Sequence, residues 1–375
     1  MTWRHGPEDE EEPRIDAYGD EEEPPPPVMP WRAAAPATPS EATHVVVNDV
    51  YDDEIPVPTR GERAAAAAAR TRAAIPPAVG HVARLLLFAA AVIGALAGIG
   101  VAWQHVVNDP LADAHAYYEA AVRLNAGQPL YPAGIDPSSN HIYLYPPLLA
   151  VALRPLALLP FQWFALAWEL IVVASFVALV RVLGVRRRQT WLAIGLLGIP
   201  IGWALTIAQA HVPMTLLLAL GQPWSIALAA NLKLTPVLVA IWWLGRRDWQ
   251  SLLAFAVWLA LFALAQLLLE PRGSFAFFHS VGFGQIGEVR NISPYAQSPV
   301  LWIAVLLVGA VVTLALARTR WGWAAAVTLA TLSPPRLLVY MLTGLLAAIR
   351  QPKISGEPDP DDLSDPVAAY RRAVR

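Results

Sequence analysis

A carboxylate and a phenol stand four residues apart in a short polar segment between two long apolar stretches of this chain. Asp113 and Tyr117 belong to the segment NDPLADAHAYYEAAVRLNAGQPLY, which covers residues 108–131. The spacing predicts that both side chains share one face of a helix. The positive end of the helix dipole favours an ionised carboxylate at Asp113, as a general base requires. The same spacing also suits a solvated carboxylate on an interfacial helix, so the pattern alone leaves both interpretations open.

The residues on either side set the expected limits of that helix. Asp109 before Pro110 is typical of a helix start, with the aspartate as N-cap and the proline in the first turn. Gly127 after Asn125 is typical of a helix end. We therefore predict that Asp109 is a cap rather than a reacting group, and that His115, on another face, is interfacial rather than a ligand.

The composition indicates a protein that crosses a membrane several times. The chain has 375 residues, of which 56% are hydrophobic and 15% charged, and its mean hydropathy is +0.44. The absence of cysteine excludes disulfides and thiolate metal sites. No glycine-rich nucleotide loop precedes a helix, and the Asp-x-Asp pattern at 359–361 lies in a polar tail. We therefore expect no metal, no cofactor and no nucleic-acid partner.

Five apolar stretches are long enough to cross a bilayer, which requires about 20 residues of helix. They cover residues 84–106, 161–183, 190–208, 249–269 and 299–317, and three less regular stretches cover 145–160, 211–244 and 321–349. Basic clusters between spans favour the cytoplasmic side, and placing all of them there gives about ten crossings, or alternatively eight. We thus expect a multi-pass protein of the inner (plasma) membrane with both termini cytoplasmic.

The same argument makes residues 107–160 and 270–298 the two large outer loops. The stretch 145–160 becomes an outer-surface or re-entrant helix rather than a span, because it contains prolines and an arginine. The two short hairpins turn near Lys233 and at Ser333–Arg336.

By composition the chain divides into a membrane domain and two polar tails. Residues 1–80 form an acidic tail rich in proline and alanine, and 15 of the 29 acidic residues lie within positions 1–59. Such a segment cannot bury enough apolar surface to offset the entropy of ordering, so we expect a disordered cytoplasmic tail that can bind cytoplasmic partners. Residues 81–350 form the membrane domain, and residues 351–375 form a second cytoplasmic tail.

Several short motifs follow one another along the chain. The first series joins Asp113 and Tyr117 to Leu130-Tyr131 and Tyr145-Pro146-Pro147-Leu148. Further motifs are Lys233-Leu234-Thr235-Pro236, Arg246-Arg247-x-Trp249, Asn291-x-Ser293 and Ser333-Pro334. Together they resemble glycosyltransferase family 87, and the first series is the most specific part of the resemblance. Family members often have Gly-Gln-x-Asn where this chain has Ala208-Gln209-Ala210-His211, and they often have tryptophan and histidines where it has Arg336 and Tyr340.

The resemblance implies an all-α polytopic membrane protein of the GT-C class, with about 8–10 transmembrane helices and interfacial helices in the first outer loop. It also implies an enzyme that transfers a sugar, usually mannose, from a polyprenyl-phosphate donor to a lipid-linked glycan acceptor outside the membrane. In this family an acidic residue of the first outer loop is the catalytic base, and Asp113 is the matching position. The candidate substrate-binding residues are Tyr117, Tyr131, Tyr145, Gln209, His211, Lys233, Arg290, Asn291 and Arg336.

When one carboxylate deprotonates an acceptor hydroxyl, the oxygen of that hydroxyl can displace the lipid phosphate from the sugar in a single inverting step. The departing phosphate gains negative charge, so a cation must lie near it. The candidates are Lys233, Arg272, Arg290 and Arg336. Because a lysine within an apolar stretch is costly unless it reaches a cavity, a partner or the surface, Lys233 suits either donor binding or a surface position among membrane lipids.

Two functions of other classes remain open at this point. A lipid or sugar-lipid transporter would use Glu169, Lys233 and Gln209 along a path, although Glu169 also suits a hydrogen bond between helices. A non-catalytic scaffold for envelope assembly would use the acidic tail to bind partners. The tyrosines likewise suit an aromatic belt at the membrane surface.

Overall fold

A computed structural model describes residues 77–132, 142–280 and 289–352 of the chain. These residues form helices joined by turns and connections, with no strand among them, which confirms the predicted all-α class. They all belong to one compact unit that begins at Arg72. The predicted disorder of both tails concerns residues that lie almost entirely outside the described ranges.

Within the described ranges, four helices are long and apolar enough to cross a membrane. They are α2 (Pro77–Asn108), α5 (Phe161–Leu183), α11 (Trp249–Leu269) and α13 (Pro299–Leu316). In the most apolar windows of α11 and α13 only 6% of the residues are buried, so these helices present apolar surface outward as a lipid-facing helix does. The chain is thus a multi-pass membrane protein, and four of the five predicted long spans are confirmed.

The fifth predicted span, 190–208, is not one continuous helix. It consists of α6 (Arg188–Leu196) and α7 (Gly198–Thr206), which meet at an angle of 72°. Pro200 explains the break, because proline has no N–H for the carbonyl of Leu196 and its ring would clash with that carbonyl. Leu196 is accordingly the last residue of α6.

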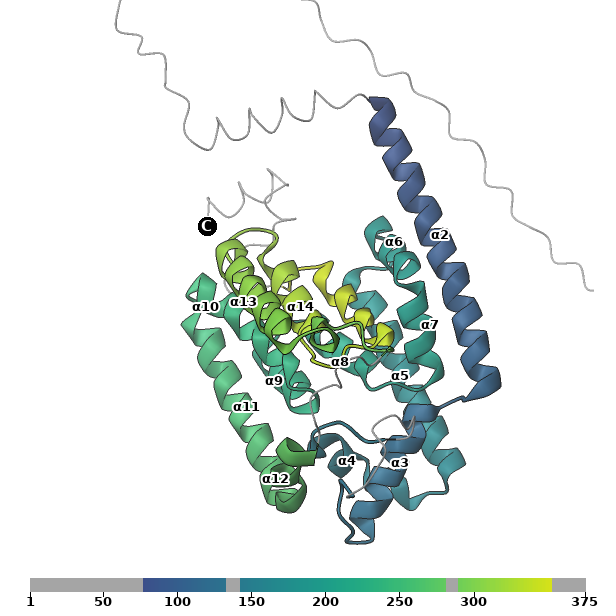
Figure 1. Cartoon of the computed structure of the whole chain (residues 1–375), viewed down its shortest axis with the longest axis vertical. Coiled ribbons are helices and arrows are strands. Elements are labelled where there is room, and N and C mark those ends of the chain that lie inside the picture. The colour runs from purple at the N-terminus through teal and green to yellow at the C-terminus, as the bar shows by residue number, and fades with distance from the viewer. Residues whose placement is uncertain (1–76, 133–141, 281–288, 353–375) are drawn as a thin grey trace, which may run out of the picture. The chain divides into compact units, whose positions relative to one another are not determined.

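Helix α2 packs along both halves of this broken span (Figure 1). The contact is close because glycines face each other: a Cβ on Gly98 would lie 2.2 Å from the carbonyl oxygen of Gly198, and one on Gly94 would lie 2.4 Å from that of Gly195. Backbone-to-backbone approach of this kind is typical of helix pairs in membranes. It fixes the position of the C-terminal end of α2 relative to α7.

The irregular stretches 211–244 and 321–349 form short helices, each too short to cross a bilayer alone. They are α8 (His211–Leu220), α9 (Pro223–Leu232), η2 (Thr235–Val239), α10 (Ala240–Arg246), α14 (Gly322–Leu332) and η4 (Val339–Ala348). Helix α9 ends before Lys233, where the sequence predicts a turn, because Pro236 cannot extend it. The predicted number of crossings stays a prediction.

Short helices also occupy the two predicted outer loops. The first loop contains α3 (Ala112–Asn125), α4 (Pro147–Leu153) and η1 (Leu156–Leu158), and the second contains α12 (Pro271–Ser280) and η3 (Pro294–Ala296). Helix α4 packs against α3, α9, α11 and α12 (Figure 1). The stretch 145–160 therefore forms short helices rather than a span, and α3 ends at Asn125 with Gly127 at a positive φ of 67°, both as predicted.

The predicted start of α3 is wrong. Helix α3 begins at Ala112, and its N-cap position is Leu111, which has a φ of 60° and no side-chain cap. Asp109 instead continues the last turn of α2, since its N–H donates to the carbonyl of His105. The N–H groups at the start of α3 are satisfied by the end of α7, because Leu111 and Asp113 donate to the carbonyls of residues 206 and 207 at 3.1 Å.

The glycine contact between α2 and α7 leads to a stability prediction. We expect Gly98→Ala to lower the free energy of unfolding by about 1–3 kcal/mol, because the added methyl must displace backbone atoms of α7. Gly100→Ala is the matched control, since nothing lies within 4 Å of a Cβ there, and alanine is the better helix former. Thermal unfolding of both variants in detergent tests this, and equal unfolding temperatures would contradict it.

Candidate active site

One cavity of about 820 Å³ lies among the ends of α2, α3 and α7 and the breaks between the short helices. Its polar lining includes five of the predicted site residues, namely Asp113, Tyr145, Lys233, Arg290 and Arg336. They come from both predicted outer loops and from the two predicted hairpin turns. Asp109 also lines the cavity, so the fold brings two carboxylates and three cationic side chains together there.

A buried amide connects Asp113 to two tyrosines. The hydroxyls of Tyr117 and Tyr145 both donate to Oε1 of Gln209, at 2.6 Å for Tyr117, and Nε2 of Gln209 donates to Oδ2 of Asp113. The N–H of Ala210 donates to the Tyr117 hydroxyl at 3.2 Å. Because the amide oxygen accepts both phenols, its NH₂ group is left to face the carboxylate. The predicted shared face of Asp113 and Tyr117 is confirmed by their common partner.

Gln209 reaches this position because the chain turns sharply between α7 and α8. Ala208 adopts a φ of 57°, a left-handed conformation that is rare for a residue with a Cβ. Its carbonyl accepts a hydrogen bond of 2.7 Å from the indole of Trp168 on α5. Gln209 itself is fully buried. A strained backbone stabilised by tertiary contacts therefore places the amide between the tyrosines and Asp113.

The surroundings of Asp113 determine its protonation. Burial raises the pKa of its carboxyl to about 7, while Lys233 and the hydrogen bond from Gln209 act in the opposite direction and Asp109 adds to the rise. Desolvation is the largest of these influences, so the carboxyl is less acidic than its position near the start of a helix predicted. Burial also raises the pKa of Tyr117 and Tyr145 well above the usual range, so both phenols stay protonated as donors.

Lys233 points its ammonium group at a weak acceptor. Its Nζ donates to the Sδ of Met341 at 2.9 Å, and among the described residues no carboxylate is in salt-bridge contact with it. A thioether compensates poorly for the lost hydration of an ammonium group. An anionic ligand in the cavity would therefore be a better partner for Lys233 than the protein provides.

Asn291 fixes the two arginines relative to each other. Its Nδ2 donates to the carbonyl of Pro335, and its Oδ1 accepts the N–H of Leu337, both at 2.9 Å. These two bonds flank Arg336, while Arg290 directly precedes Asn291 in the chain. Asn291, predicted to bind substrate, is itself buried and does not line the cavity. It holds the second outer loop against the segment before η4.

Residues 143–349, more than half of the chain, match the model of glycosyltransferase family 87. The chain belongs to glycosyltransferase family 87. The family resemblance predicted from short motifs is thereby confirmed. The match begins at Tyr143, so it includes Tyr145, Lys233, Arg290 and Arg336 but stops short of Asp113.

Two curated relatives carry the name polyprenol-phosphate-mannose-dependent alpha-(1-2)-phosphatidylinositol pentamannoside mannosyltransferase. The relative from Mycolicibacterium smegmatis is 27% identical over 244 residues, which cover 58% of this chain and 60% of the relative. The relative from Mycobacterium tuberculosis is 26% identical over 253 residues, which cover 60% of this chain and 57% of the relative. The chain thus spans about three fifths of the length of these relatives. No solved structure matches the chain significantly.

Several predicted site residues of this family member lie behind the cavity wall. Tyr117 and Gln209 support Asp113, and the Tyr131 hydroxyl donates to the carbonyl of Tyr145 at 2.6 Å. His211 is buried, and no side-chain hydrogen bond reaches either of its ring nitrogens. Arg272 also lies outside the lining, so three of the four predicted cations reach the cavity.

Among the lining residues that escaped the sequence prediction, four come from α2 and α7 and carry polar or aromatic side chains. Gln104, His105 and Asn108 come from the last two turns of α2, and Trp203 comes from α7. The signal was present in the sequence: three polar residues cluster on one side of a helix at the end of an otherwise apolar span. The described residues contain no group of three or more His, Asp or Glu side chains that could hold a metal.

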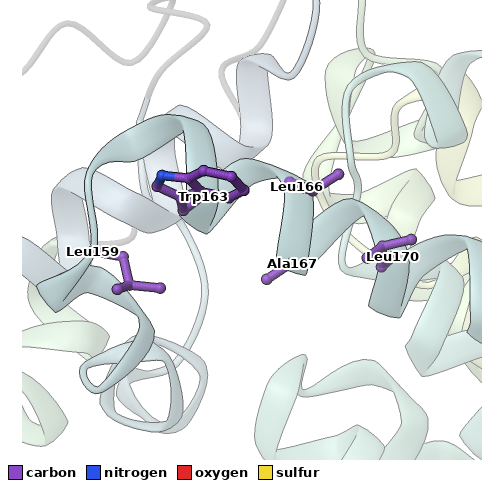
Figure 2. A pocket seen from close by; sticks show the side chains of 5 residues that line it. All are labelled: Leu159, Trp163, Leu166, Ala167 and Leu170. Carbon is purple, nitrogen blue, oxygen red and sulfur yellow. The ribbon is translucent and has the colours of Figure 1, made fainter.

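A second hollow, on the outer surface of α5, has a different character. Figure 2 shows its five lining side chains, Leu159, Trp163, Leu166, Ala167 and Leu170, and the hollow measures about 460 Å³. It contains no charged or amide side chain, so it suits an acyl chain of the surrounding lipid rather than chemistry. Glu169 on the same helix was expected to bond to another helix, but no hydrogen bond reaches its buried Oε2.

The role of Gln209 leads to a prediction for the network. We expect Gln209→Leu to raise the pKa of Asp113 above about 7, because the stabilising N–H of the amide is lost. It should also lower the free energy of unfolding by about 1–3 kcal/mol, because buried phenols lose their acceptor. Infrared titration of the carboxyl and thermal unfolding measure these effects. Gln128→Leu, at an exposed position, is the control. The same pKa of Asp113 and the same unfolding temperature in both variants would contradict the prediction.

Proposed function

We propose that this protein is a membrane glycosyltransferase that transfers mannose from a polyprenyl-phosphate donor to a lipid-linked glycan. The observation that carries the proposal is the single cavity that unites Asp113 with Lys233, Arg290 and Arg336. The names of the two curated relatives support the donor and the class of acceptor. Membership of glycosyltransferase family 87 supports the reaction type.

Asp113 is the proposed general base. It accepts the proton of an acceptor hydroxyl while that oxygen forms a bond to C1 of mannose and the bond from C1 to the phosphate oxygen breaks. The electron pair of the broken bond leaves with the polyprenyl phosphate, and the configuration at C1 is inverted. A carboxyl with a pKa of about 7 suits this task, because it is both substantially ionised and basic near neutral pH.

Lys233, Arg290 and Arg336 are the proposed phosphate ligands. A polyprenyl phosphate gains negative charge as the sugar departs, and three cations at one cavity stabilise that charge. Guanidinium groups bind phosphate oxygens in a planar fork, whereas an ammonium acts as a compact charge. Asn291 contributes indirectly, because it holds the segments that carry both arginines.

Tyr145 is the remaining predicted substrate residue that lines the cavity. Its ring is a proposed contact for the transferred sugar, while its hydroxyl is held by Gln209. Tyr117, Tyr131 and Gln209 then act as positioning residues, because they hold Asp113 and Tyr145 without reaching the cavity.

We further propose that the cavity lies on the extracytoplasmic side of the plasma membrane, with both termini cytoplasmic. This rests on the distribution of basic residues between the spans. The acceptor is then a glycan that is completed outside the cytoplasm. A transporter path of the kind considered from the sequence would need Glu169 in the same passage, but Glu169 does not line the cavity.

The first test concerns the base. We expect Asp113→Asn to reduce kcat by about 10²–10⁴-fold, the usual contribution of a general base, in an assay with polyprenyl phosphate mannose and a mannosyl lipid. In the wild type, kcat/KM should fall as the pH drops below about 7, because protonation removes the base.

The matched control is Glu119→Gln, which changes an exposed carboxylate of the same helix to an amide. It should leave the rate and its pH dependence unchanged. Full activity of Asp113→Asn with unaltered expression would rule out the proposed role.

The second test concerns the phosphate ligands. We expect Lys233→Met to raise KM for the donor about tenfold to a hundredfold, because a charge-assisted hydrogen bond is worth about 1.5–3 kcal/mol. The same variant should move the pH midpoint of activity upward, because Lys233 lowers the pKa of Asp113.

Arg272→Met provides the control, since Arg272 is an exposed cation of α12 outside the cavity lining. An unchanged donor KM in Lys233→Met would exclude Lys233 from donor binding, and an equal rise in Arg272→Met would show a general effect of charge.

A further inference from the structure

We propose that the C-terminal end of α2, together with Trp203 of α7, forms the subsite that binds the sugar of the acceptor. The proposal rests on the proposed transferase function and adds the location and chemistry of the second substrate. The ligand class is a neutral, polyhydroxylated ring, such as a terminal mannose of a glycolipid.

The first observation is a polar face on an apolar helix. Val101, Gln104, His105 and Asn108 line the cavity, and their spacing places all four on one face of α2. The rest of this span is strongly apolar, with a mean hydropathy of 2.5 in its most apolar window. Trp103, on a different face, is 71% exposed and faces outward. Polar residues near the end of the span are therefore gathered where a ligand could reach them.

The second observation is the aromatic side chain beside these polar groups. The ring of Trp203 lies 4.8 Å from that of His105 and 6.0 Å from that of Tyr340, and all three residues line the cavity. An indole offers a rigid apolar surface for the C–H face of a sugar ring. The carboxamides of Gln104 and Asn108 each offer two donors and an acceptor for its hydroxyls. Together the indole and the carboxamides match the apolar C–H face and the hydroxyl groups of a sugar ring.

The third observation is the position of this wall relative to the base. Asn108 precedes Asp113 by five residues, and the start of α3 is hydrogen-bonded to the end of α7 through Leu111 and Asp113. Trp203 lies about one turn before that end. An acceptor ring held against the end of α2 and Trp203 therefore lies beside the carboxylate that must remove its proton.

The charge distribution separates this wall from the phosphate site. The lining residues that α2 and α7 contribute include no lysine or arginine, whereas the described cations of the cavity are Lys233, Arg290 and Arg336. A neutral sugar needs hydrogen-bonding groups but no counter-charge. The polyprenyl chain of the donor is a poor occupant here, because it would cover amides without satisfying their hydrogen bonds.

The test measures KM for the donor and KM for the acceptor in one system. The full chain is reconstituted in lipid nanodiscs with polyprenyl phosphate mannose as donor and octyl α-mannoside as acceptor probe. We expect the double variant Gln104→Ala with Asn108→Ala to raise KM for octyl mannoside about tenfold, as the loss of roughly 1.4 kcal/mol of binding would. Both side chains are exposed, so the variant should fold normally.

KM for the donor should stay within about twofold of the wild-type value, because the lost hydrogen bonds bind only the acceptor. Trp203→Leu should likewise raise KM for octyl mannoside and leave KM for the donor unchanged. Trp103→Leu is the matched control, since it removes an indole of neighbouring α2 that faces outward. A rise in donor KM alone, or unchanged constants for both substrates, would overturn the subsite.

A binding measurement separates this proposal from the transferase proposal. Radiolabelled octyl mannoside is titrated into nanodiscs that contain the Asp113→Asn chain, with and without the Gln104 and Asn108 substitutions. Absence of transfer by the wild type would refute the proposed function. The subsite is refuted separately if the added substitutions leave mannoside binding unchanged, and supported if binding falls about tenfold, the effect of roughly 1.4 kcal/mol.

Discussion

The side-chain amide of Gln209 is the interaction on which the rest of the site depends. It is fully buried, and it accepts two tyrosine hydroxyls while donating to Asp113. A buried polar network stabilises a structure only when all its members are satisfied. This amide satisfies a carboxylate and two phenols from separate segments, so its position determines where α3 and the Tyr145 segment can lie relative to α7. The left-handed Ala208 beside it shows that the backbone accepts strain to keep it there.

The network also determines the electrostatics of Asp113. A carboxylate in an apolar bundle loses its hydration, and burial accordingly raises its pKa to about 7. Gln209 and Lys233 both act against that rise, so they favour the ionised form of the carboxyl. With them it titrates where a general base is most effective. The same residues that hold the carboxylate in place therefore keep it usable as a base.

The sequence predicted the long spans well because their signal is length and apolarity, as in 161–183 and 249–269, which are helical over the same residues. It failed where tertiary contacts decide local structure. Asp109 has the side chain and the following proline of a cap, yet the carbonyls at the end of α7 satisfy the start of α3 instead. Asp113, Lys233 and Arg336, which chemistry and motif singled out in the sequence, all line the cavity. Gln104 and Asn108 were missed although they belong to a polar cluster at the end of an apolar span, because only the structure shows that this face of α2 lines the cavity.

Irregular backbone is costly within a membrane domain unless it lines a cavity or is buried in protein. Three breaks in this chain meet that condition together: residues near Lys233, the Pro334-Pro335-Arg336 segment and Ile207 at the end of α7 all line the same cavity. Helix ends leave N–H and C=O groups unsatisfied, and here the start of α3 and the end of α7 satisfy each other. The breaks between helices therefore bring polar side chains into the membrane domain. Each of these three interruptions would be unfavourable against lipid, and each supplies a lining residue to the cavity.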